Sequence, residues 1–252
     1  MSQDVTLLEG LLPSRVRWAQ AVIPEIHGGL DAPSGEPDTI EAGLFPEERE
    51  HIAQSVAKRR AEFAAVRRCA RRALQELGYP PVPILPGEHR EPQWPEGVLG
   101  SMTHCTGYCA AVVARTGDVP VLGIDAEVHA PLPEGVLDLV SLETERERLA
   151  KLAAQVPGSV HWDRILFSAK ESVYKAWFPM TRRWLGFEEA DIELRPDGTF
   201  EAVLQPAPAE SSTQPASWPK PPPPAPSSLP RGFAGRWAVA GGLIATAIGE
   251  VI

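Results

Sequence analysis

The placement of proline sets the strongest limit on how this chain can fold. The chain has 252 residues and 27 prolines, and ten of those prolines lie between residues 205 and 230. Proline lacks a backbone N–H and has a fixed φ, so it fits neither a helix interior nor a central strand. We therefore expect residues 205–230 to form an extended, mobile loop, with the regular structure outside them.

One long stretch without internal proline lies near the N-terminus. Residues 46–78 are rich in alanine and arginine, and Gly78, Pro80 and Pro81 follow as stop signals. This pattern predicts a single helix over that stretch. Its apolar residues recur at helical spacing and predict a buried stripe. The stripe consists of Val56, Phe63, Val66, Ala70, Leu74 and Leu77.

Short apolar runs elsewhere predict strands joined by tight turns. The expected strands are a hairpin over 98–114 turning at Thr106 and Gly107, a strand over 119–128, a pair within 184–204 joined at 196–198, and a final hairpin turning at Gly241 and Gly242. Helices are expected between residues 137 and 178, the second beginning at Asp163 as N-cap and ending before Pro179. Both halves of the chain thus run from helix to hairpin, which is a repeat of element order rather than of residues.

Composition restricts the class of protein. Apolar residues make up 43% of the chain, enough for a large core, and the net charge of -9 argues against general nucleic-acid binding. The three cysteines predict reduced thiols in a cytosol. Cys105 and Cys109 with the neighbouring His104 give three possible zinc ligands and no fourth, so a zinc site is not expected. The acidic start and the lack of an apolar run of about 18 residues argue against a signal peptide or a membrane span. A cytoplasmic protein is expected.

Two carboxylates lie close together in the run VLGIDAEV. The period of a strand puts Asp125 and Glu127 on one face. A divalent cation would remove their mutual repulsion, and oxygen ligands of this kind suit Mg²⁺. A solvated strand end would carry the same residues without a ligand, so this motif alone leaves both interpretations open.

The run FSAKESVYKAW sets three charged residues among aromatic ones. Glu171 and Lys175 are one helical turn apart, which is typical of a surface salt bridge. The surrounding Phe167, Tyr174 and Trp177 leave little of the helix for water. We therefore expect the charges to line a cleft, where Glu171 would add a third metal carboxylate and the lysines would meet bound phosphate.

Two further groups of polar residues are candidates for binding an anion. Thr103 and His104 lie near the end of a predicted strand, where a structural histidine is the alternative. Arg59 and Arg67 lie two turns apart on the predicted helix, where a solvated charged face is the alternative. The forked guanidinium of arginine is well suited to an anionic ligand.

Four segments in this order resemble the Sfp-type 4′-phosphopantetheinyl transferases, and within them the actinobacterial kind. The segments are KRRAEF with VRRCAR, REPQWPEGVLGSMTHCTGY, VLGIDAE, and HWDRILFSAKESVYKAWFP with RRWLGFE. They span most of residues 46–192. The resemblance implies an α+β fold of two similar halves, 1–118 and 119–252, related by a pseudo-twofold. Each half would pack a small antiparallel sheet on a long helix, and the active site would lie between them.

The resemblance also implies roles for individual residues. Asp125, Glu127 and Glu171 resemble the ligands of Mg²⁺, with Glu171 also the catalytic base and Lys175 the group that stabilises the leaving group. The remaining positions resemble coenzyme A contacts: Lys170 and Lys175 at the phosphates, and Arg59, Arg67, Thr103 and His104 at the nucleotide end and its 3′-phosphate. The loop ILPGEHREP lacks a lysine that relatives often carry there, and Arg90 is the candidate substitute.

The implied activity is transfer of the 4′-phosphopantetheine arm of coenzyme A to a serine of an apo acyl- or peptidyl-carrier protein. The enzyme is expected to be a monomer that binds neither nucleic acid nor membrane. Two alternatives remain open. A Mg²⁺-dependent nuclease or phosphohydrolase would also need paired carboxylates and a lysine, and a non-enzymatic interaction module would act through the proline-rich segment.

Overall fold

The computed structural model describes residues 6–23, 41–156, 158, 160–205 and 229–252. The proline-rich loop expected at 205–230 lies almost entirely outside these residues. The described part is a mixed α and β structure with two antiparallel sheets. Contacts divide it into two compact units, residues 14–119 and a second unit in which residues up to Pro13 group with residues 120–252.

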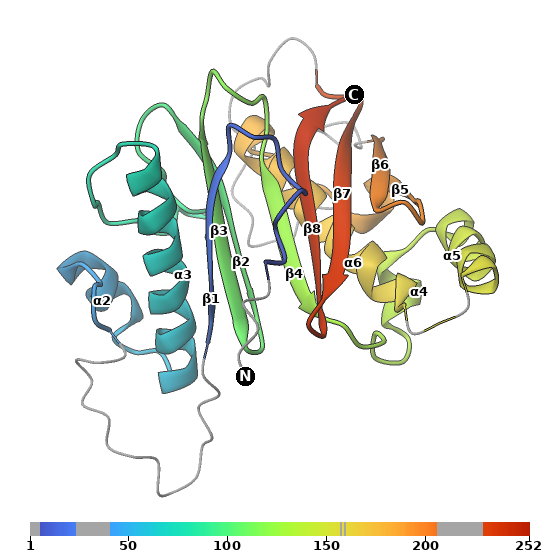
Figure 1. Ribbon diagram of the computed structural model, residues 1–252, viewed down its shortest axis with the longest axis horizontal. Helices are drawn as coiled ribbons and strands as arrows, with labels where there is room; N and C mark the ends of the chain where they lie inside the picture. Colours follow the sequence, from blue (N-terminus) through green and yellow to red (C-terminus); the bar gives the residue numbers. More distant parts are fainter. Residues whose placement is uncertain (1–5, 24–40, 157, 159, 206–228) are drawn as a thin grey trace, which may run out of the picture. The chain divides into compact units, whose positions relative to one another are not determined.

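The unit of residues 14–119 packs one long helix on a three-stranded sheet. Its elements are β1 (Arg17–Val22), α2 (Pro46–Ile52), α3 (Ala57–Glu76), β2 (Val98–Cys105) and β3 (Tyr108–Arg115). The strand order is β1-β3-β2, and α3 lies along one face of the sheet (Figure 1). The expected hairpin at Thr106 and Gly107 is confirmed, and Gly107 has the positive φ that a tight turn requires. Strand β1 was not predicted.

The single helix predicted over 46–78 is wrong, because α2 ends at Ile52 and α3 begins at Ala57. Ile52 and Phe63 share a small buried cluster with Leu44 and Ala64. In one continuous helix these two side chains would lie about 16 Å apart along the axis, so their contact needs a turn. Val56 lies in that turn and is 74% exposed, whereas the stripe residues from Phe63 to Leu74 are buried as expected.

The second unit packs a long helix on a five-stranded sheet. Its elements are β4 (Gly123–Val128), α4 (Val136–Val140), α5 (Glu143–Gln155), α6 (Trp162–Thr181), η1 (Phe187–Glu189), β5 (Ala190–Leu194), β6 (Thr199–Leu204), β7 (Gly232–Ala240) and β8 (Leu243–Val251). The strand order is β4-β8-β7-β6-β5, and α6 lies against the sheet (Figure 1). The apolar residues of α6 share one buried core with residues of β5, β6, β7 and β8. The predicted strand pair and final hairpin are confirmed.

Both predicted ends of the helix now seen as α6 are wrong by a few residues. The N-cap is His161, while the carboxylate of Asp163 instead accepts a hydrogen bond from Leu132 N at 2.7 Å. Pro179 lies inside the last turn. That turn is retained because Thr181 Oγ1 donates to Trp177 O at 3.0 Å and Arg182 N donates to Phe178 O at 2.8 Å.

Gly123 marks a close approach of α6 to β4. A Cβ built on Gly123 would lie 2.1 Å from the carbonyl oxygen of Ser172 and 2.9 Å from Ala176 N. Backbone atoms cannot rotate away as a flexible side chain can, so a methyl group here would force the helix off the strand. The face of β4 that carries Gly123 therefore points toward α6.

Gly123→Ala is expected to lower the free energy of unfolding by about 1–3 kcal/mol, the usual effect of overpacking a close contact. Urea denaturation of the purified variant measures the loss. Gly117→Ala is the matched control, since a Cβ at Gly117 meets no atom within 4 Å. Equal stability of the two variants would contradict the close helix–strand packing.

Candidate active site

The period of strand β4 places Asp125 and Glu127 on the same face as Gly123, and hence toward α6. Lys175 of α6 donates from Nζ to Asp125 Oδ1 at 2.7 Å, and Arg164 of α6 donates from Nη1 to Glu127 Oε2 at 3.1 Å. Asp125 is buried, and Glu127 is partly buried. The two carboxylates of the strand are thus each held by a cation of the helix.

Glu171 joins these residues from the same helix. Burial raises the pKa of Glu171, and the nearby charge of Asp125 raises it further, while Lys175 opposes both effects. Burial and Asp125 likewise raise the pKa of Glu127 against the opposing charges of Arg164 and Lys175. Glu127 and Glu171 therefore both lie within electrostatic range of Asp125, and the three residues are called here the carboxylate cluster.

The donor chemistry of the carboxylate cluster fits a hard divalent cation. The cluster offers only carboxylate oxygens, the ligands that Mg²⁺ prefers, and burial together with the charge of Asp125 raises the pKa of Glu127 and of Glu171. Among the described residues, no group of three or more His, Cys, Asp or Glu side chains is arranged to hold a metal ion. In this arrangement Lys175 and Arg164 compensate the charge of the two strand carboxylates.

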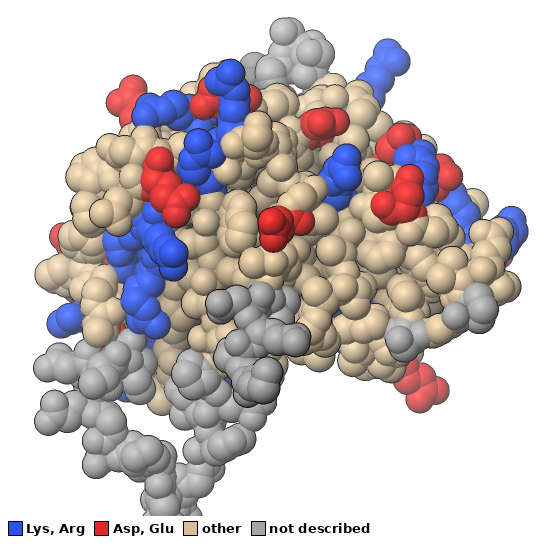
Figure 2. Space-filling view, in the orientation of Figure 1, with Lys and Arg blue, Asp and Glu red and all other residues tan. Residues whose placement is uncertain are grey.

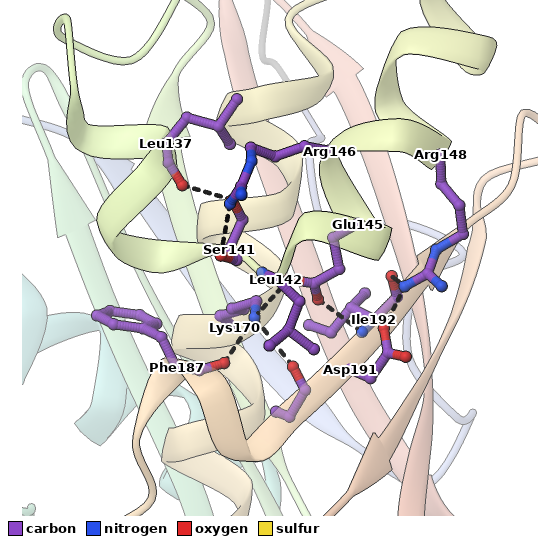
Figure 3. A network of polar contacts seen from close by, with 11 residues as sticks. Leu137, Ser141, Leu142, Glu145, Arg146, Arg148, Lys170, Phe187, Asp191 and Ile192 are labelled. Atoms are coloured by element: carbon purple, nitrogen blue, oxygen red, sulfur yellow. Dashed lines mark hydrogen bonds and ion pairs between the residues drawn. The ribbon is translucent and has the colours of Figure 1, made fainter.

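Lys170 lies in a different environment from Glu171. Its ammonium group donates to Glu145 Oε2 at 2.8 Å, to Phe187 O at 2.7 Å and to Ala190 O at 2.9 Å, as Figure 3 shows. These three acceptors match the three N–H donors of a lysine. Only 1% of the Lys170 side chain is exposed, and burial lowers its pKa against the effect of Glu145.

Glu145 ties this buried pair to two further segments of the chain. Its carboxylate accepts hydrogen bonds from Leu142 N at 2.7 Å and from Ile192 N at 2.8 Å, and none of its side chain is exposed (Figure 3). The pair thus joins α5, α6 and β5. The ammonium group of Lys170 therefore lies in the packing between α6, α5 and β5, where Glu145 and two carbonyl groups bind it, and not in the carboxylate cluster.

The other candidate residues lie in the unit of residues 14–119, where α3 carries a basic surface. Figure 2 shows Lys and Arg side chains gathered over α3 on the face in view. Arg59 Nη1 lies 3.2 Å from His104 Nε2, and this imidazole nitrogen lies 3.6 Å from Glu62 Oε2. The structure thus brings together the helix residue Arg59 and the strand residue His104.

Arg67 lies deeper in the same region. Its guanidinium stacks 3.6 Å from the ring centroid of Phe63, and its Nε donates to Ile84 O at 3.2 Å. Burial lowers the pKa of Arg67 to about 10; Glu48 opposes the shift, and the charges of Arg59 and Arg71 add to it. A bound anion would relieve the repulsion among these arginines.

Thr103 does not join Arg59 and His104. Successive residues of a strand point to opposite faces, and Met102, on the face of His104, packs in the core beneath α3. Thr103 is buried on the other face of the sheet. Arg90, the candidate substitute for a lysine, is exposed in a tight loop where it adopts a φ of 69°.

Arg164 was not identified from the sequence. It precedes Glu171 by seven residues and Lys175 by eleven, so all three lie along one face of α6. That spacing was a signal in the sequence.

The three cysteines are free thiols, and the sulfur atoms of Cys69 and Cys109 lie 3.8 Å apart in the core.

Two models of known protein families match the chain. Residues 47–114 match the 4′-phosphopantetheinyl transferase N-terminal domain, and residues 121–225 match the 4′-phosphopantetheinyl transferase superfamily. The chain therefore belongs to the 4′-phosphopantetheinyl transferases, as its resemblance to that family predicted.

Three relatives from actinobacteria cover most of the chain. The 4′-phosphopantetheinyl transferase Svp of Streptomyces mobaraensis is 50% identical over 96% of this chain and 88% of its own. PptT of Mycobacterium tuberculosis is 51% identical over 77% of this chain and 80% of its own, and Npt of Nocardia iowensis is 49% identical over 84% and 90%.

Proposed function

We propose that this protein transfers the 4′-phosphopantetheine arm of coenzyme A to a serine of an apo acyl- or peptidyl-carrier protein. The serine oxygen would attack the phosphorus that bears the pantetheine arm, and the bond to the bridging oxygen would break, releasing adenosine 3′,5′-bisphosphate. Membership in the transferase family supports this proposal. The observation that carries it is the meeting of Asp125, Glu127, Glu171 and Lys175 at β4 and α6.

The carboxylate cluster would hold Mg²⁺, which when bound supplies positive charge to the pyrophosphate oxygens. Glu171 is the proposed general base, because its partly buried carboxylate has a raised pKa and is therefore better able to take the serine proton. Lys175 would stabilise the leaving phosphate or give it a proton, an electrostatic role suited to phosphoryl transfer. The position of Lys175 beside Asp125 and Glu171 supports that role.

The nucleotide end of coenzyme A and its 3′-phosphate would be bound by Arg59, Arg67 and His104. The burial of the Arg67 guanidinium, which lowers its pKa, and the proximity of Arg59 to His104 support an anion there. Thr103 stays in the proposal only by resemblance. Lys170 is left out, because its three donors are engaged by Glu145 and two carbonyl groups.

Three further details complete the proposal. They are the pseudo-twofold relation of the two halves, which the resemblance implies, a monomeric state and a cytoplasmic location. In the described part of the chain, no helix combines the length and apolar character needed to cross a bilayer.

Intact mass spectrometry tests the activity. Apo carrier proteins of the fatty-acid, polyketide and nonribosomal-peptide types would be incubated with enzyme, coenzyme A and Mg²⁺. A gain of one phosphopantetheine group is expected, and no gain on any carrier type would reject the proposal. Release of labelled product from DNA would favour the nuclease alternative instead.

His104→Ala tests the proposed grip on the 3′-phosphate. If the imidazole and Arg59 contact that phosphate, the variant should raise the KM for coenzyme A about 10-fold, the effect of losing one charge-assisted hydrogen bond, and leave the KM for 3′-dephospho-coenzyme A nearly unchanged. Steady-state kinetics with both substrates gives the comparison. Equal effects on the two substrates would return His104 to a structural role.

A further inference from the structure

The first turn of α6 holds the segment that follows β4. His161 N donates to His129 Nε2 at 3.2 Å, and Asp163 Oδ2 accepts from Leu132 N at 2.7 Å. Arg164 adds bonds to Ala130 O and Pro131 O. Four consecutive residues after Val128 are therefore fixed by three residues of one helix, directly beside Glu127.

Arg164 is the centre of this contact. Its Nε donates to Ala130 O at 3.1 Å, its Nη2 to Pro131 O at 2.8 Å and its Nη1 to Glu127 Oε2 at 3.1 Å. All three guanidinium nitrogens are thus used, on two backbone carbonyls and one carboxylate. A planar guanidinium with all its nitrogens bonded has a fixed orientation, unlike a typical surface ion pair.

The contact engages one oxygen of the Glu127 carboxylate. The hydrogen bond from Arg164 goes to Oε2. The side chains of Arg164 and Glu127 are 17% and 24% exposed, so water competes only partly for the pair. One oxygen is therefore held in place while the carboxylate stays anchored at the end of β4.

We propose that Arg164 is a positioning residue of the metal site, which orients the Glu127 carboxylate by bonding Glu127 and the backbone of residues 130 and 131 at once. This inference rests on the proposed function, because it takes Glu127 to be a Mg²⁺ ligand. Partners that orient metal ligands typically change metal affinity 10- to 100-fold when they are removed. The fork of arginine matters as much as its charge.

Arg164→Lys separates the fork from the charge. A lysine keeps the positive charge but offers a single ammonium group on a flexible stem, which cannot hold the carboxylate and both carbonyls in one plane. Arg164→Gln removes the charge as well. If Arg164 acted only through charge, Arg164→Lys would bind a cation as the wild type does, and Arg164→Gln would bind it more tightly.

Binding of Mn²⁺, as a probe for Mg²⁺, would be measured on the purified full-length enzyme by electron paramagnetic resonance. We expect both Arg164 variants to bind Mn²⁺ at least about 10-fold more weakly, with coenzyme A affinity by calorimetry unchanged. Arg195→Lys is the matched control, since Arg195 pairs with Glu201 of β6 at the same 3.1 Å but with side chains 37% and 46% exposed.

Three results with the Arg164 variants would overturn the inference. They are wild-type Mn²⁺ affinity in Arg164→Lys, tighter binding in Arg164→Gln, and a parallel loss of Mn²⁺ affinity, coenzyme A affinity and Tm that indicates general unfolding. Glu127→Gln is measured alongside, and unchanged Mn²⁺ affinity there would overturn the metal assignment and this inference together. Transfer to a carrier protein is measured separately by mass, so failure of the activity itself is distinguishable.

Discussion

Glu171→Gln is expected to slow phosphopantetheine transfer by at least about 100-fold, the lower end of the cost of losing a general base. The change keeps the shape of the side chain and one oxygen but removes the negative charge. It should therefore weaken metal binding and abolish proton transfer together. Single-turnover kinetics with saturating coenzyme A and an apo carrier protein measures the rate.

Two controls isolate this effect. Coenzyme A should still bind to Glu171→Gln, because Arg59, Arg67 and His104 are untouched, and calorimetry checks this. Glu147→Gln makes the same chemical change at an exposed position of α5 and should leave the rate unaltered. A Glu171→Gln enzyme within a few-fold of wild type would dismiss Glu171 as both base and metal ligand.

Lys170→Met is expected to lower the free energy of unfolding by about 3–5 kcal/mol, because it leaves the buried carboxylate of Glu145 without its countercharge. Urea denaturation measures the loss. The double variant Lys170→Met with Glu145→Gln should be more stable than the single variant, since no unpaired charge remains. Lys151→Met, at an exposed position of α5, is the control and should change stability by less than about 0.5 kcal/mol.

The same variant separates two roles for Lys170. A lysine that binds the phosphates of coenzyme A should give a variant of near-normal stability with a raised KM for coenzyme A. A lysine that packs α6 against α5 and β5 should instead give a variant of lowered stability with an unchanged KM for coenzyme A. Near-normal stability with a raised KM would restore Lys170 to the coenzyme A site.

The elements predicted best are those specified by local chemistry. The turns at Gly107 and at Gly241 and Gly242 were correct because each glycine adopts a positive φ that other residues disfavour. Strand β1 was missed because its pairing partner, β3, lies about 90 residues further along the chain. No local pattern reports such a pairing, and its stability comes from the core that it shares with α3.

The sequence by itself determined which residues of each element share a face. The two-residue period of β4 put Asp125 with Glu127, and one helical turn put Glu171 with Lys175. These periods are fixed by backbone geometry, so they hold wherever the element packs. The family resemblance, carried by ordered motifs, was likewise available from the sequence.

Only the tertiary structure decided where the charges point. Lys170 and Glu171 are neighbours in the chain, yet neighbouring residues of a helix point about 100° apart, and the packing of α5 and β5 took Lys170 into the core. Arg164 pairs with Glu127 because α6 packs on β4 at Gly123. A charged side chain in the sequence indicates that a partner is required if it is buried. Which residue becomes that partner depends on how elements distant in the chain pack together.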